Sequence, residues 1–332
     1  MPKVIVFGKS KRKTRKVAHI ARAFSDLGNE TLWLNAHRIR RWLKSWANPY
    51  ILKRIERFAP DIVFIHNMDL PLAVLEKLSG THMLTVMYYH DGWRLDQLDE
   101  VAKWGRQVDL FLENAKGLHD QFREVGIKDP VFIIEGCDKH EHTIRKAVLP
   151  IWKSDVAFVG AARPDEPRIQ LIRDLSQICK VRIYGKDWQR FNLRTTLREV
   201  RPRGYAKVCS GAKIMLGIDA VTTIEGHWTN RLWLTLGCGG FHLTNYIPGM
   251  EEVFENRKHL VWYHDHDECI SLVREYLAKP EERKRIAMTG YAYVHEHHTF
   301  HHFARKVLEL CDEAMRAKRS PALEGGHEDS PH

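Results

Sequence analysis

The sequence predicts an α/β protein of two doubly wound domains that face each other across a cleft. Three observations support this fold class. The chain has 332 residues, more than a single hydrophobic core usually accommodates, so two domains are expected. Short apolar runs alternate with helix-length segments along almost the whole chain. These runs are continuously apolar rather than alternating, as in strands of parallel sheets that helices cover on both faces.

The first series of strands defines an N-terminal domain, which we place at residues 1–145. Helix-length segments such as 14–27 and 115–125 separate its strands. The expected strands are residues 4–7, 31–34, 61–65, 83–89, 109–112 and 131–134.

The pattern then restarts after a polar segment with a late proline, residues 135–155, which we interpret as the linker. The second series consists of strands at 156–160, 180–185, 213–218, 240–244 and 259–263, with helices near 166–179, 229–238 and 265–278. We therefore expect a C-terminal domain at residues 146–316, which includes the terminal helices, and a disordered tail at 317–332. In such sheets ligands bind beyond the carboxyl ends of the strands, where the cleft would lie.

The composition, 44% hydrophobic and 28% charged, is that of a globular protein. No apolar run approaches the roughly 18 residues that a membrane span needs, and the N-terminus lacks the apolar core of a signal peptide. We therefore expect a cytoplasmic protein without a membrane span. The six cysteines are scattered without a CxxC pair, which favours reduced core thiols over disulfides or a zinc site.

The net charge of +10 is concentrated in the N-terminal quarter, because residues 1–60 hold fifteen Lys and Arg against three Asp and Glu. Within it, residues 38–44 interleave basic side chains with Trp42, and Trp46 follows. This mixture is typical of a surface that meets a polyanion or stacks on flat rings. The alternative is a solvated helix whose tryptophans pack inward.

Residues 230–263 combine a helix start, a glycine-rich turn and two apolar strands. A helix that begins near Asn230 leaves backbone N–H groups free and carries partial positive charge, which suits a phosphate. Arg231 in the first turn could grip the phosphate with two donors. The glycines at 237–240 let the helix end and allow close approach. The segment predicts a site for a diphosphate-bearing ligand, although such an arginine is also common as a plain surface residue.

Residues 230–310 resemble the C-terminal half of CgeB-type, spore maturation protein-like glycosyltransferases. The shared features, in one order, are R-x-aromatic, CG, F-x-LT, PG-x-EE-x-F, KHLVWY and a PEER-x-RIA-x-x-G helix. Residues 158–172, 181–188 and 86–93 resemble further segments of this family, whereas the likeness in residues 1–80 is loose. These enzymes are relatives of the retaining GT4-like group, which implies the GT-B fold with two Rossmann-like domains.

The resemblance implies a hexosyl- or pentosyltransferase that moves a sugar from a nucleotide-diphosphate donor to an acceptor hydroxyl, with retention, no cofactor and no metal. The C-terminal domain would grip the nucleotide, and cations and helix N-termini would neutralise the leaving diphosphate. Our donor-binding candidates are Gly160, Arg163, Arg168, Gly185, Lys186, Asn230, Arg231 and Thr244. The catalytic candidates are His90 and Asp91 at the end of a buried strand; a purely structural cap of that strand is the alternative.

The acceptor implied by the basic quarter is large and anionic or ring-bearing: modified DNA or another nucleic acid, or a surface or spore polysaccharide. The acceptor-binding candidates are Lys11, Arg12, Arg38, Arg40, Arg41 and Trp42. For the histidine-rich run at 295–302 we expect a hydrated helix face rather than a functional metal site.

One departure from the wider group keeps two other functions open. That group carries a glutamate, which binds the donor ribose, four residues before the CG, where this chain has Leu234. Glu225 does not replace it in register. A non-catalytic binding module of the same fold is therefore one alternative, and a nucleotide-sugar epimerase is another.

Overall fold

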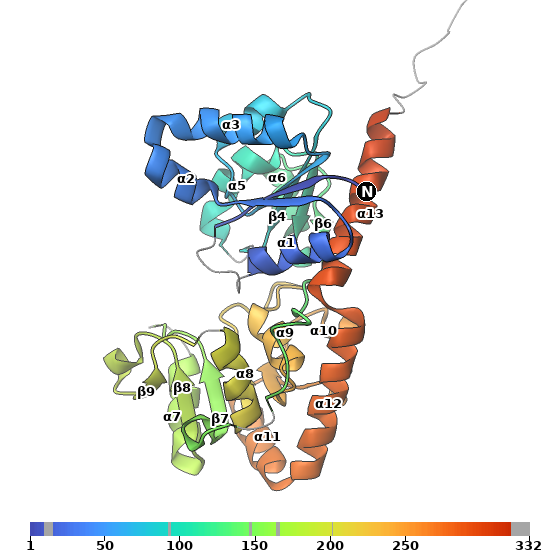
Figure 1. Ribbon diagram of the computed structural model, residues 1–332. Coiled ribbons are helices and arrows are strands. Elements are labelled where there is room, and N and C mark those ends of the chain that lie inside the picture. The colour runs from blue at the N-terminus through green and yellow to red at the C-terminus, as the bar shows by residue number, and fades with distance from the viewer. Residues whose placement is uncertain (10–15, 92–93, 146–147, 164–166, 201, 320–332) are drawn as a thin grey trace, which may run out of the picture.

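The computed structural model describes residues 1–9, 16–91, 94–145, 148–163, 167–200 and 202–319. It consists of two stacked lobes, each built on a six-stranded sheet with helices on both faces (Figure 1). We call them the N-terminal lobe, with strands β1 to β6, and the C-terminal lobe, with strands β7 to β12. The predicted fold class, two doubly wound units that face each other, is confirmed.

The N-terminal sheet has the order β2-β1-β3-β4-β5-β6, and its neighbouring strands pair in parallel. The strands are β1 Val4–Phe7, β2 Thr31–Leu34, β3 Ile62–His66, β4 Leu84–Tyr89, β5 Leu110–Glu113 and β6 Val131–Phe132. The helices are α1 Lys16–Asp26, α2 Ala36–Leu43, α3 Ala47–Phe58, α4 Leu72–Leu75, α5 Leu98–Gly105 and α6 His119–Glu124. Strands β1, β3 and β4 are buried at every position, which explains their continuously apolar sequences.

The C-terminal sheet has the order β12-β11-β10-β7-β8-β9, again with parallel pairs. The strands are β7 Ser154–Val159, β8 Val181–Tyr184, β9 Thr195–Leu197, β10 Ala212–Gly217, β11 His242–Asn245 and β12 Val261–Tyr263. The helices are α7 Pro167–Ile178, α8 Pro202–Gly211, α9 Asn230–Gly237, α10 Met250–Val253, α11 His266–Ala278, α12 Pro280–His297 and α13 Phe300–Arg319. Among the described residues, no helix combines the length and apolarity that a bilayer span requires.

Helix α13 corrects our expectation that the terminal helices belong with the C-terminal unit. It packs against α1, and Phe300, Phe303 and Val307 are buried in one cluster with Phe24 and Phe64 of the N-terminal lobe. The reason is that one face of the N-terminal sheet beside α1 needs cover, and the apolar stripe of α13 supplies it (Figure 1). The expected tail is still helical to Arg319, and residues 320–332 lie outside the described part.

The chain crosses between the lobes after β6 and again between α12 and α13, and the two crossings are hydrogen-bonded to each other. Cys137 N donates to His298 O at 2.9 Å, and Phe300 N donates to Cys137 O at 2.9 Å. Gly136 lies so close that a Cβ there would collide with the carbonyl of His298. The run at 295–302 is therefore a junction between two helices, not the hydrated helix face that we expected, and His301 in it is only 8% exposed.

Candidate functional site

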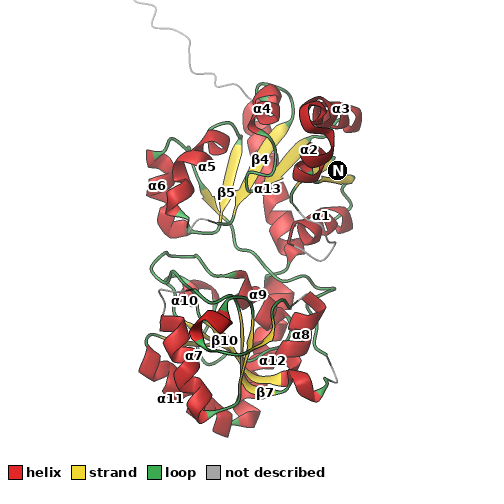
Figure 2. Ribbon diagram, turned by 90° about the vertical axis from the view of Figure 1, so that its left-hand side faces the viewer, coloured by secondary structure: helices red, strands yellow, loops and turns green. Residues whose placement is uncertain are grey.

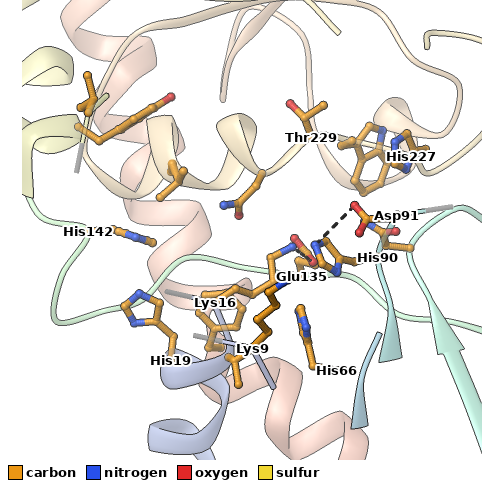
Figure 3. Close-up of a pocket in the computed structure, with 18 of the residues that line it drawn as sticks. Lys9, Lys16, His19, His66, His90, Asp91, Glu135, His142, His227 and Thr229 are labelled. Atoms are coloured by element: carbon orange, nitrogen blue, oxygen red, sulfur yellow. Dashed lines mark hydrogen bonds and ion pairs between the residues drawn. The ribbon is translucent and has the colours of Figure 1, made fainter. Parts of the chain in front are cut away.

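A cavity of about 590 Å³ lies between the lobes (Figure 3). The N-terminal lobe lines it with side chains that follow strand ends, among them Lys9 after β1, His66 at the end of β3 and His90 after β4. The C-terminal lobe contributes Thr229 and Asn230, where α9 begins. The cavity thus lies beyond the carboxyl ends of the N-terminal strands, as parallel sheets predict.

His90 and Asp91 are held in this cavity by one residue, Asn67. The Oδ1 atom of Asn67 accepts from the backbone N of His90 at 3.1 Å and from its ring Nδ1 at 2.8 Å. The Nδ2 atom of Asn67 donates to Asp91 Oδ2 at 2.9 Å. Since an N–H and a carboxylate fix which amide atom is oxygen, the His90 proton must lie on Nδ1. The Nε2 atom of His90, 3.8 Å from Asp91 Oδ1, therefore carries the lone pair.

The surroundings keep His90 neutral. Burial lowers its pKa well below the ordinary value, and the nearby positive charge of Lys16, with His66 and His227, lowers the pKa further. A neutral imidazole with a fixed Nδ1 proton can accept a proton at Nε2. The Nε2 atom of His90 is therefore unprotonated at neutral pH and available to accept a proton.

A buried carboxylate network supports the floor of the cavity. Glu135, 3% exposed, accepts on Oε1 from both Lys16 Nζ and the hydroxyl of Tyr88. Its other oxygen, Oε2, is buried and has no hydrogen-bond partner among the described residues. Figure 3 shows Glu135, Lys16 and His90 close together on the same side of the cavity. Lys16 and Glu135 therefore form an ion pair beside His90.

On the C-terminal side, Asp219 anchors the start of α9. Thr229 donates from Oγ1 to Asp219 Oδ1 at 2.7 Å, and the guanidinium of Arg231 forms an ion pair with the same oxygen. Although burial raises the pKa of Asp219, Arg231 and Thr229 lower it below the ordinary value. Asn230 lines the cavity in the first position of α9. The helix N-terminus is therefore fixed in place with its free end toward the cavity.

Leu234 lines the same cavity one turn along α9 from Asn230. The position at which the resemblance led us to expect a glutamate therefore faces the cavity in this chain, and an apolar side chain occupies it. A ribose hydroxyl placed there would find no carboxylate from this residue.

The predicted donor arginines gather in a second cavity of about 160 Å³ behind the start of α9. Arg231 donates to Ile218 O at 2.8 Å, and Arg168 donates to Ala161 O and Ile218 O, both at 2.9 Å. Much of their hydrogen-bonding capacity is thus used within the protein. The lining consists of Ala161, Arg163, Arg168, Ala220, Val221, His227, Thr229 and Arg231.

The other donor candidates differ in their surroundings. Gly160 and Gly185 lie against each other, because a Cβ on Gly185 would collide with the carbonyl of Gly160. Lys186 is exposed beside them, and its carbonyl accepts from Ala162 N at 2.9 Å. Thr244 is only 2% exposed and packs in β11 against Gly217.

The acceptor candidates that the structure describes lie on an exposed corner formed by α2 and the 3₁₀ turn Lys44–Trp46. Trp42 is 73% exposed and Trp46 is 74% exposed, so the tryptophans do not pack inward. Arg38, Arg40 and Arg41 are exposed as well. The corner lies on the side of the N-terminal lobe away from α13 (Figures 1 and 2), whereas Lys9 and Lys16 line the cavity. Lys11 and Arg12 lie outside the described residues.

Several residues in or beside the cavity were not singled out from the sequence. Asn67, Lys16 and Glu135 sit in three different segments, and only the fold brings them to His90. His227 and Tyr205 line the cavity from the C-terminal lobe. One signal was present for Asn67: a polar residue directly after a buried strand, which is where ligand-binding residues of parallel sheets lie.

Comparison with known proteins agrees with the two-lobed fold. Residues 166–309 match a family described as glycosyl transferase-like. Among curated protein sequences, none gives a significant match. Similar solved structures include HepE of Anabaena in complex with UDP and glucose, at 12% identity and a TM-score of 0.68, covering 94% of this chain and 100% of that one.

Two further structures have the same TM-score of 0.68. Sucrose-phosphate synthase of Thermosynechococcus elongatus is 11% identical and covers 96% of this chain and 100% of its own. An alpha-glucosyltransferase in complex with UDP-glucose and DNA containing an abasic site is 10% identical and covers 94% and 99%. Identities this low show the fold alone. This chain therefore has the GT-B fold, and its residues 166–309, less than half of its length, are similar to a glycosyl transferase-like family.

Proposed function

We propose that this chain is a CgeB-type glycosyltransferase that moves a sugar from a nucleotide-diphosphate donor to an acceptor hydroxyl. The C-terminal lobe holds the donor, with the diphosphate at the start of α9, and the N-terminal lobe presents the acceptor. As in the wider group, transfer proceeds with retention and without a metal. The bond from the sugar to the diphosphate breaks, a bond to the acceptor oxygen forms, and the acceptor loses its proton.

One observation carries the proposal. His90 is neutral, its Nδ1 proton is fixed by Asn67, and it lines the same cavity as Thr229 and Asn230 at the N-terminus of α9. A proton acceptor and an anion-binding helix end therefore line one space large enough for a small ligand. His90 is our catalytic residue, and Asp91 assists it.

The experiment is a donor panel with matched histidine variants. Wild-type protein is incubated with nucleotide sugars, UDP-glucose first, and the release of nucleoside diphosphate is measured with and without acceptor. We expect His90→Gln to lower turnover by about 10²-fold or more, the usual contribution of a general base, while donor binding persists. His82→Gln, at an exposed position of the same lobe, is the control. Equal turnover in His90→Gln and wild type would refute the role of His90.

The exposed corner of α2 supports a polyanionic acceptor, for which we propose DNA with hydroxylated bases. Two tryptophans exposed by more than 70% beside Arg40 and Arg41 offer stacking faces and phosphate partners together. DNA affinity should fall steeply with salt and drop at least tenfold in the double variant Trp42→Ala/Trp46→Ala. Leu149→Ala, which changes a 68% exposed residue of the linker, is the control. DNA affinity that does not depend on salt would exclude nucleic acid as the acceptor and leave a polysaccharide.

Leu234 favours the second candidate, a binding module without turnover. An apolar side chain at the ribose position removes one donor contact that relatives use. The protein is a binding module rather than an enzyme if no donor is hydrolysed and no sugar is transferred to any acceptor, while a nucleoside diphosphate still shifts the melting temperature. Interconversion of free donors without an acceptor would instead identify an epimerase.

A further inference from the structure

Three polar side chains converge beside the hydrogen-bonded crossings between the lobes. Asp26 is the last residue of α1, His140 lies in the linker, and His301 lies in the first turn of α13. None of them belongs to the lining of the central cavity. They join three segments that are far apart in the sequence.

The geometry of the cluster is compact. Both Nε2 atoms point to one oxygen, since His301 Nε2 lies 2.8 Å and His140 Nε2 lies 3.4 Å from Asp26 Oδ2. The three potential ligand atoms all lie within 4.8 Å of one another. Ligands bonded to one zinc ion at about 2.0–2.2 Å must lie within about 4.4 Å of one another. Small side-chain rotations therefore suffice to place all three atoms around one ion.

We propose that Asp26, His140 and His301 form a site for a divalent transition-metal ion of the zinc class. Two imidazoles and one carboxylate supply three protein ligands and leave a position for water. The donor set disfavours Mg²⁺ and Ca²⁺, which prefer oxygen ligands. This site is separate from the chemistry proposed for the cavity and does not depend on it.

A metal ion at this site would affect the stability of the protein. The crossings meet where Cys137 bonds to His298 and Phe300, a few residues from His140 and His301. A bound ion would tie both crossings to the end of α1. Binding only to the folded state should therefore raise the melting temperature as metal concentration rises.

The test uses the full chain without an affinity tag of histidines, stripped with a chelator and then titrated with Zn²⁺ by calorimetry and with Co²⁺ by absorption. His140→Ala is the main variant, because the His140 side chain is 51% exposed and its loss should not disturb folding. His297→Ala, at a side chain also 51% exposed in the histidine-rich run, is the matched control.

We expect wild type and His297→Ala to bind one equivalent of Zn²⁺ and to gain melting temperature. His140→Ala and Asp26→Asn should bind Zn²⁺ at least tenfold more weakly, and their melting temperature should not rise with Zn²⁺. The proposal is overturned if wild type binds no Zn²⁺, or if His140→Ala matches wild type in stoichiometry and affinity. If Zn²⁺ were bound by other histidines of the chain, His140→Ala would match wild type in stoichiometry and affinity.

Discussion

At the residue scale, the cavity depends on side chains that orient others. Asn67 sits in the left-handed region at φ 51°, where asparagine is tolerated better than most residues. From there one amide reaches both His90 and Asp91. The backbone conformation at the end of β3 and the tautomer of His90 are therefore set by the same residue.

Asn67→Gly and Asn67→Ala separate these two roles. Both variants remove the amide that holds the Nδ1 proton of His90, so both should lower turnover, by about 10²-fold if the tautomer is lost. Glycine tolerates a positive φ, whereas alanine should cost about 1 kcal/mol of stability in addition. Steady-state kinetics and urea denaturation measure the two effects. Wild-type turnover in Asn67→Gly would mean that Asn67 has only a backbone role.

Arg231 was predicted to bind phosphate, yet the structure also gives it a structural partner. Its guanidinium pairs with Asp219, whose side chain is 7% exposed. Arg231→Ala would leave that carboxylate buried without its cation, so we expect the free energy of unfolding to fall by about 3–5 kcal/mol. In an Asp219→Asn background, Arg231→Ala should lower the free energy of unfolding much less. A double-mutant cycle measures this difference. Equal costs in both backgrounds would show that the pair does not stabilise the fold.

At the scale of elements, α13 connects the C-terminal end of the chain to the N-terminal core. Phe303 is 2% exposed, and its ring lies 5.0 Å from that of Tyr88 and 6.3 Å from that of Phe64, measured between centroids. Tyr88 in turn donates to Glu135 beneath the cavity. A helix near the C-terminus therefore supports both the first sheet and the proposed site.

Phe303→Ala should consequently destabilise the protein by about 3–5 kcal/mol, as expected for a large buried aromatic side chain. The control is Met288→Ala on α12, where the side chain is 43% exposed and the expected change is within about 0.5 kcal/mol. Urea denaturation followed by circular dichroism measures both. A change below 1 kcal/mol for Phe303→Ala would mean that α13 contributes little to the N-terminal lobe.

The elements also show what a sequence can predict. Strands such as β1 and β3 were found because burial on both faces leaves them continuously apolar. Strand β9 was missed because its sequence, TTL, is short and half polar. The apolar stripe of α13 reveals a buried face but not the lobe that it covers, since that depends on contacts with α1 almost 300 residues earlier. His90 and Asp91 were recognised from a local motif. Asn67 had only the weaker signal of a polar residue directly after a buried strand, and the role of Glu135 depends on its contacts with Lys16 and Tyr88.

At the scale of the whole molecule, the chain buries histidines in both lobes and at their junction. Burial lowers the pKa of His142, which packs in the linker, to about 3, and that of His242 on β11 to about 4. Both are therefore neutral in the folded protein at pH 7. In the unfolded chain a histidine has a pKa of about 6.5.

The sign of the pH dependence follows from this difference. Below about pH 6.5, His142 and His242 become protonated in the unfolded chain but stay neutral in the folded protein. Acidification therefore favours unfolding. The stability is complete above about pH 7 and declines toward pH 4, by about 2 kcal/mol for each residue at pH 5. Urea denaturation at pH 7 and pH 5 measures the total change. In His242→Gln, which keeps a hydrogen-bond donor for Met215 O, the difference between the two pH values should shrink by about 2 kcal/mol, because one such proton acceptor is gone. An undiminished difference would mean that His242 is protonated in the folded protein or that its burial is relieved in solution.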